Sequence, residues 1–97
     1  MSNLSTKSDM NIVHNEAAKR FETSIDGQTA YISYKEREDK LVYDHTIVPQ
    51  ELGGRAVGSA LVKHALDYAR KNNKKVVPQC SFVASYIDKN PDYKDLL

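Results

Sequence analysis

The stretch ELGGRAVGSALVKHALDYARK, residues 51–71, carries the strongest structural signal in this sequence. Three glycines fall within its first eight residues, and an amphipathic pattern follows them. Small and apolar residues then recur at the spacing of one helix face, at Gly58, Leu61, Val62, Ala65, Leu66 and Ala69. The pattern predicts a helix that begins among small residues, and Asn72-Asn73 predicts its end.

The glycines at the start of this helix have two competing explanations. Glycine in a helix costs about 0.5–1 kcal/mol relative to alanine, so its use needs a reason. A sharp turn into the helix would explain Gly53 and Gly54, and close packing on a sheet would explain Gly58. Alternatively, the bare amides of the first turn, with Arg55 beside them, bind an anion such as a phosphate. A Walker loop is excluded, because no Gly-Lys-Ser/Thr follows at the required spacing.

The residues before the helix indicate three antiparallel strands. Residues 21–25 and 30–35 alternate in hydrophobicity, and Asp26-Gly27 between them is a strong tight-hairpin signal. A charged turn at 36–39 leads into a third strand at 41–48, which ends before Pro49. Four residues of this third strand are expected to share one face, namely Leu41, Tyr43, His45 and Ile47.

The residues after the helix complete the predicted fold. Residues 76–80 indicate a short strand, and a right-handed crossover would place it parallel to residues 41–48. Ser81 is expected to cap a second helix over residues 82–89, with Pro91 just beyond it. The predicted class is therefore α+β, with a mixed sheet made of an antiparallel three-stranded meander and a parallel fourth strand, a crossover helix and a C-terminal helix.

Length and composition limit the possible functions. The 97 residues suit one domain over residues 11–97, and the polar residues 1–10 are expected to form a flexible arm. Ile12 and Val13 are candidates for an additional first strand, with residues 15–18 as a turn or bulge. A net charge of +1 gives no argument for nucleic acid, and no apolar run approaches the roughly 20 residues that span a bilayer.

The cysteine and histidine content adds further expectations. Cys80 is the only cysteine, so the fold needs no disulfide, and the first residues lack the apolar core of a signal peptide. A cytoplasmic protein is therefore expected. The three histidines are scattered, so no metal site is expected. A monomer or a weak homodimer is expected, since exposed strand edges in so small a sheet could favour self-association.

Two segments together resemble the GNAT superfamily of acetyl-coenzyme A-dependent N-acetyltransferases. They are HTIVPQELGGRAVGSALVKHALDYAR, residues 45–70, and KVVPQCSFVASYIDKNPDYKDLL, residues 75–97. More narrowly, the chain looks like the small, truncated GNAT-like proteins that end with Cys-Ser/Pro-Phe/Tyr-Val-Ala-x-Tyr and a downstream Pro-x-Tyr. The resemblance covers roughly residues 21–97. It implies acetyl-coenzyme A as co-substrate and an amine as acceptor, whose identity the sequence does not give.

The resemblance also implies a coenzyme site. The superfamily's loop motif, Gln/Arg-x-x-Gly-x-Gly/Ala, falls on Gly53, Ala56 and Gly58, and the first two positions depart from it. The pantetheine arm is expected to lie along Ile47 and Val48, where the two parallel strands part. The residues expected around the pyrophosphate are Arg55, Ala56, Val57, Gly58, Ser59 and Ala60.

Two residues are the main candidates for catalysis. Cys80 is expected beside the coenzyme at the start of the second helix, where the helix dipole lowers a thiol pKa, and its thiolate could attack a thioester. The alternative is a buried structural cysteine. His45 precedes the glycine-rich loop and could act as a general base, because histidine titrates near neutral pH. The alternative is a structural histidine of the sheet.

Two residues of the second helix complete the predicted site. The resemblance implies that Tyr86 protonates the departing thiolate, and packing against the coenzyme is the alternative. Asn90 and Lys89 could each reach a coenzyme phosphate or face water, and water is favoured for Lys89. The sequence therefore predicts an acetyl-coenzyme A-dependent acyltransferase. The alternatives are a non-catalytic module that binds coenzyme A or acyl-coenzyme A, and an interaction domain that keeps only the fold.

Overall fold

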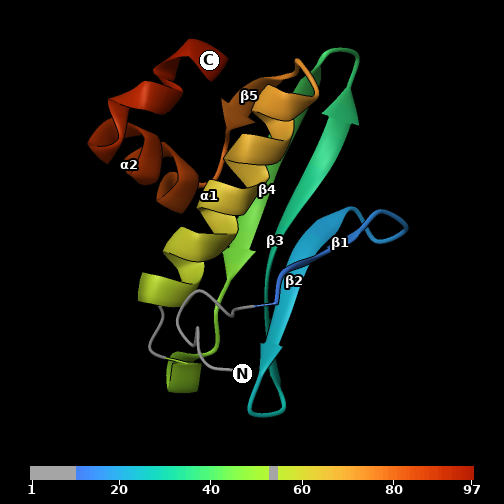
Figure 1. Cartoon of the computed structure of the whole chain (residues 1–97), viewed down its shortest axis with the longest axis vertical. Helices are drawn as coiled ribbons and strands as arrows, with labels where there is room; N and C mark the ends of the chain where they lie inside the picture. Colours follow the sequence, from blue (N-terminus) through green and yellow to red (C-terminus); the bar gives the residue numbers. More distant parts are fainter. Residues whose placement is uncertain (1–10, 53–54) are drawn as a thin grey trace, which may run out of the picture.

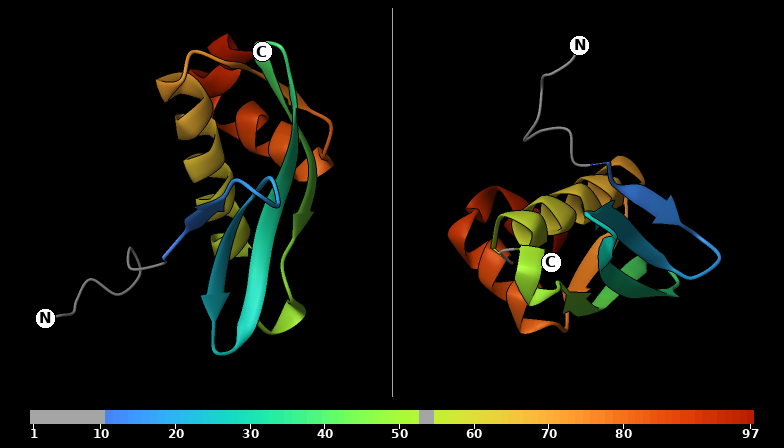
Figure 2. Two further views of the ribbon diagram at one scale, coloured as in Figure 1. Left: turned by 90° about the vertical axis from the view of Figure 1, so that its right-hand side faces the viewer. Right: turned by 90° about the horizontal axis from the view of Figure 1, so that it is seen from below.

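The computed structural model describes residues 11–52 and 55–97, which form a five-stranded sheet with two α-helices packed on one face (Figures 1 and 2). The strands lie in chain order, and only the β4–β5 pair is parallel. The strands are β1 (Val13–Asn15), β2 (Arg20–Ile25), β3 (Gln28–Arg37), β4 (Lys40–Ile47) and β5 (Lys75–Pro78). The helices are α1 (Arg55–Lys71) and α2 (Ser81–Lys89), with short 3-10 helices η2 (Gln50–Leu52) and η3 (Pro91–Leu96).

The α+β class, the crossover helix and the parallel last strand are confirmed. The antiparallel part has four strands instead of three, because β1 pairs with β2. The hairpin at Asp26-Gly27 is also confirmed, and both residues have the positive φ that its two-residue turn requires, 52° and 78°. The next turn is shorter than predicted. Glu36 and Arg37 still pair with β4, and Glu38 takes the positive φ of the turn.

The predicted apolar stripe of α1 forms the centre of the core. All six of its residues are buried, and the five after Gly58 belong to one core cluster with β-strand side chains such as Phe21 and Ile32. Tyr43 of β4 is fully buried, and its hydroxyl donates a hydrogen bond of 2.6 Å to the carbonyl oxygen of Ala65. The helix ends as predicted. Asn73 adopts a left-handed conformation, and the amide of Lys74 reaches back to the carbonyl of Ala69.

A bulge in β4 overturns the predicted alternation of that strand. Tyr34 pairs with Tyr43 and Ser33 pairs with His45, so Asp44 is an extra residue without a partner on β3. Because an extra residue shifts the alternation by one, His45 does not continue the face of Tyr43. His45 and Ile47 instead lie on the face of the sheet that the helices leave open, and both are exposed.

The start of α2 also differs from the prediction. Strand β5 ends at Pro78 instead of Cys80, and Cys80 occupies the N-cap position that had been expected for Ser81. No side-chain hydrogen bond caps this helix. The expected arm, residues 1–10, and the expected turn glycines, Gly53 and Gly54, lie outside the described residues. No helix within residues 11–52 and 55–97 is long and apolar enough to cross a bilayer.

Candidate functional site

The candidate site lies where the two parallel strands stop pairing. The β4–β5 ladder runs from Lys40 and Lys75 to Tyr43 and Pro78. Beyond it the chain leaves β5, and the amide of Cys80 donates a 3.0 Å hydrogen bond to the carbonyl of Tyr43. Figure 1 shows β4 continuing past the end of β5, next to the start of α2. The predicted parting of these strands is thus present in the structure.

A cavity of about 820 Å³ occupies this end of the sheet. Four of its nine lining residues were predicted for the coenzyme, namely Val48, Ser59, Tyr86 and Asn90. The other five are Thr46, Ser81, Phe82, Ser85 and Lys89. Five of these nine described residues carry hydroxyl groups, and Lys89 adds a charged ammonium group. Such a lining suits an extended polar ligand that carries negative charge.

The residues that the sequence prediction missed come mainly from one face of α2. Positions 81, 82, 85, 86, 89 and 90 follow a helical spacing of three to four residues. Tyr86 and Asn90 were predicted for the coenzyme, and Lys89 was expected to face water, although it also lines the cavity. The helical period, applied to Tyr86 and Asn90, would have found the rest.

The first turn of α1 borders the cavity through Ser59. No acidic side chain lies in this turn, which keeps the positive end of the helix free for an anion. The predicted pyrophosphate residues of this segment do not all face the cavity. Ala56 is exposed, Val57 is buried in the core, and Ala60 is half-buried outside the cavity lining. Arg55 is the first residue of the helix.

Gly58 is explained by close packing, against a different element from the one predicted. A Cβ atom at this position would lie 2.6 Å from Cζ and 2.9 Å from Cε2 of Phe82. Gly58 therefore lets the ring of Phe82 approach the backbone of α1, and the contact is with α2 instead of the sheet. Because Phe82 also lines the cavity, this glycine fixes the position of one cavity wall.

Cys80 is half-buried and does not itself line the cavity, but it directly precedes Ser81, which does. Its Sγ donates to Oγ1 of Thr46, a cavity residue, over 3.4 Å. Burial by itself raises the pKa of Cys80, but hydrogen bonds from Thr46 and from the amides of Phe82 and Val83 outweigh it, so the pKa lies below its usual range. The predicted placement beside a helix start is confirmed, and the environment favours the thiolate.

The other two catalytic candidates lie on different sides of the sheet. Tyr86 is half-buried, lines the cavity and contacts Tyr93, with ring centroids 6.1 Å apart. The side-chain amide of Asn90 donates a 2.9 Å hydrogen bond to the carbonyl of Tyr86. This bond holds Asn90 against the end of α2. His45 lies on the open face, paired with Ser33, and is not part of the cavity lining. Ile47 is also on that face, so only Val48 of the predicted pantetheine pair lines the cavity.

Among the described ranges, no group of three or more His, Cys, Asp and Glu side chains could hold a metal ion. The described polar groups at the cavity include hydroxyls, the amide of Asn90 and the ammonium of Lys89, with the thiol of Cys80 next to Thr46. These groups can bind, polarise and exchange protons. Such an arrangement can hold an anionic ligand and support an acyl or proton transfer.

Comparison with known proteins gives a consistent result. Residues 20–96 match the family model described as GCN5-related N-acetyl-transferase. The chain is 24% identical over 94 residues to Protein NATD1 of Xenopus tropicalis, covering 94% of this chain and 86% of that protein. It is also similar to the solution structure of a candidate GCN5-like N-acetyltransferase from Staphylococcus aureus. That match has a TM-score of 0.72 and 34% identity, and it covers 92% of this chain and 88% of the other.

Proposed function

Because this chain belongs to the GCN5-related N-acetyltransferase family, we propose that it binds acetyl-coenzyme A in the cavity between α1, α2 and the end of β4. We further propose that it transfers the acetyl group to an amine. The observation that carries the proposal is the position of the cavity, at the point where the β4–β5 ladder ends and beside the Cys80–Thr46 pair.

The cavity lining fits the polar groups of the coenzyme. Hydroxyls of Ser59, Ser81 and Ser85 can donate to phosphate or amide oxygens, and Lys89 offers a formal positive charge. The first turn of α1 adds amides that have no acceptor within the helix. We therefore assign the phosphates to the side of the cavity near Ser59 and Lys89, and the thioester end to the side near Thr46.

The proposed reaction joins the acceptor nitrogen to the acetyl carbon and breaks the carbon–sulfur bond of the thioester. Acetyl-coenzyme A supplies the activated acetyl group. The phenol of Tyr86 can give a proton to the departing sulfur from the cavity side. We assign His45, which lies on the open face of the sheet, to take the proton of an amine that approaches from that face. Cys80 can take the acetyl group first, because its environment favours the thiolate. The amine would then displace Cys80 in a second step.

Thermal unfolding with and without acetyl-coenzyme A tests the binding step. At 100 times Kd, a ligand that binds only the native state stabilises it by about 2.7 kcal/mol, and Tm should rise by about 10 °C or more. Lys89→Ala should reduce this rise, whereas Lys94→Ala, an exposed lysine outside the cavity lining, should leave it unchanged. An unchanged Tm at saturating ligand, or equal effects of the two variants, would refute the assigned site.

Intact-mass measurement and an amine panel test the chemical steps. After incubation with acetyl-coenzyme A without acceptor, an acetyl group on the wild type that Cys80→Ala prevents supports the two-step route. Full turnover by Cys80→Ala supports direct attack by the amine. Acetyl-coenzyme A binding without turnover on any amine would instead support the non-catalytic module.

A further inference from the structure

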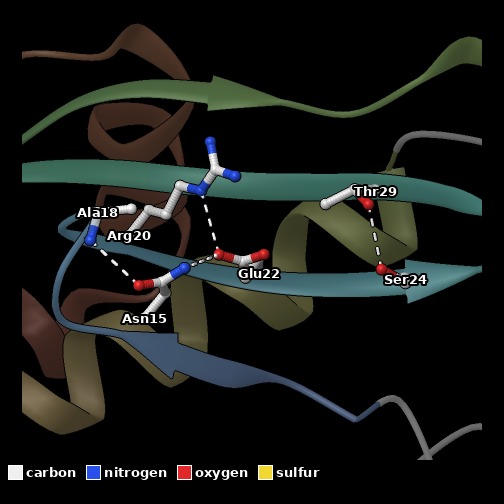
Figure 3. A network of polar contacts seen from close by, with 6 residues as sticks. All are labelled: Asn15, Ala18, Arg20, Glu22, Ser24 and Thr29. Atoms are coloured by element: carbon white, nitrogen blue, oxygen red, sulfur yellow. Dashed lines mark hydrogen bonds and ion pairs between the residues drawn. The ribbon is translucent and has the colours of Figure 1, made fainter.

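The face of the sheet opposite the helices carries polar groups that the cavity does not use. Figure 3 shows the β1–β3 part of this face, where the charges are already paired. Glu22 accepts from Asn15 at 2.9 Å and from Arg20 at 3.1 Å. The guanidinium of Arg20 in turn lies 4.5 Å from the ring centroid of Tyr31. The charged groups of Glu22 and Arg20 in this part of the face therefore already have partners within the protein.

Asp44, at the β4 end of the same face, is held differently. Its side chain is only 11% exposed, and its Oδ1 accepts a 2.7 Å hydrogen bond from Ser33. Its Oδ2 lies 3.8 Å from Nζ of Lys35, which is too long for a good hydrogen bond. Lys35 is 62% exposed, so the pair is weak and the ammonium can swing away. Asp44 therefore has a carboxylate oxygen, Oδ2, that is largely shielded from water, and its cation partner, Lys35, is easily displaced.

The bulge places this carboxylate on the open face, between two β4 residues that contact Cys80, namely Tyr43 and Thr46. Asp44 directly follows Tyr43, whose carbonyl binds the amide of Cys80. His45 lies on the same open face, whereas Thr46 turns to the cavity and contacts Cys80. Three consecutive residues of β4 thus connect the open face with the thiol side. Coenzyme in the cavity leaves the open face as the route for a second substrate.

We propose that Asp44 binds an ammonium group of the acceptor, and that the acceptor is an aliphatic amine with a second positive charge. The charged nitrogen would replace Lys35 at Oδ2 of Asp44. The reacting nitrogen would lose its proton to His45 as it bonds to the acetyl carbon and the thioester carbon–sulfur bond breaks. This inference rests on the proposed function, and it names the substrate class of that site. A free diamine and a lysine side chain near another cation share this chemistry.

Binding of 1,4-diaminobutane to the full chain, followed by NMR without acetyl-coenzyme A, tests the site separately from the reaction. We expect amide shifts at Ser33, Asp44 and His45, and weaker binding of butylamine. Asp44→Asn keeps the shape and the acceptor for Ser33, and it should weaken diamine binding about tenfold. Glu22→Gln removes a carboxylate of the same face that is already paired, and it should have no effect.

Lys35→Ala should change the affinity for the diamine in the opposite direction. Removal of the competing ammonium should tighten diamine binding about two- to fivefold. The amide spectrum of each variant shows whether it is folded. The inference is wrong if diamine and monoamine bind equally, or if Asp44→Asn and Glu22→Gln weaken binding equally. It is also wrong if Lys35→Ala does not tighten binding.

Turnover then distinguishes the sources of the amine. A preference for 1,4-diaminobutane over a lysine-containing peptide indicates a free polyamine, and the reverse indicates a lysine side chain. In both cases Asp44→Asn should remove the preference for the doubly charged acceptor. Failure of the proposed function would appear as loss of the acetyl-coenzyme A thermal shift while diamine still binds at Asp44. Failure of this inference would leave that shift intact without diamine binding.

Discussion

Replacement of Gly58 by alanine tests how α1 and α2 fit together. The new Cβ would lie 2.6 Å from Cζ of Phe82, about 0.8 Å closer than the 3.4 Å at which ordinary van der Waals contact begins. Overpacking of this kind costs about 1–3 kcal/mol. Alanine also gains up to about 1 kcal/mol of helix propensity over glycine. We therefore expect Gly58→Ala to lower the free energy of unfolding by about 1 kcal/mol.

A double-mutant cycle with Phe82→Ala isolates the clash. Without the ring, only the propensity gain remains, and Gly58→Ala should stabilise the protein by up to about 1 kcal/mol. The sign of the effect should thus reverse between the two backgrounds, with a coupling energy of about 2 kcal/mol. Urea unfolding at equilibrium measures each free energy, and unchanged m-values would show that the unfolded state is comparable. If Gly58→Ala has the same effect in both backgrounds, Phe82 is not the reason for the glycine.

Three further predictions concern single side chains. Thr46→Val should raise the pKa of Cys80, because a donor to the thiolate is lost, and the pH midpoint of the iodoacetamide alkylation rate measures it. Burial lowers the pKa of His14 in the folded state, so the unfolded state binds more protons below about pH 6.5 and stability should fall there as the pH decreases. Thermal melting between pH 5 and 7 should show this slope, and His14→Gln should flatten it. Thr23 is 2% exposed and its hydroxyl has no hydrogen-bond partner among the described residues, so Thr23→Val should stabilise the protein by about 1 kcal/mol in urea unfolding.

The sequence predicted those parts of the fold that depend on local patterns. The helical spacing of apolar residues predicted the buried stripe of α1, because a helix face that packs on a sheet must be apolar along its whole length. Asp26-Gly27 gave its hairpin, because few other residues accept two successive positive φ angles. The crossover rule then placed β5 beside β4. The first two signals each lie within one short segment, and the third needs only the order of strand, helix and strand along the chain.

The features that position the site depend on contacts between segments. The bulge at Asp44 is set by how β4 aligns with β3, and the sequence of β4 alone continues its alternation through this point. Gly58 could be recognised as a position that needs a small residue, but its partner Phe82 is 24 positions away in another helix. Phe82 and Ser85 were not predicted, because which face of the short helix α2 lines the cavity depends on how α2 packs against α1 and β4.

The bulge has a further consequence for chemistry on the two faces of the sheet. In a regular strand, Asp44 and His45 would point to opposite faces, since side chains alternate. The extra residue lets the carboxylate and the imidazole share the open face, while Thr46 still faces the cavity and the thiol. The bulge lies just beyond the last pair of the β4–β5 ladder, so among the described strands this end of β4 pairs with β3 and not with β5. A small domain can in this way present different groups to two substrates from three consecutive residues, without additional elements to form a second binding site.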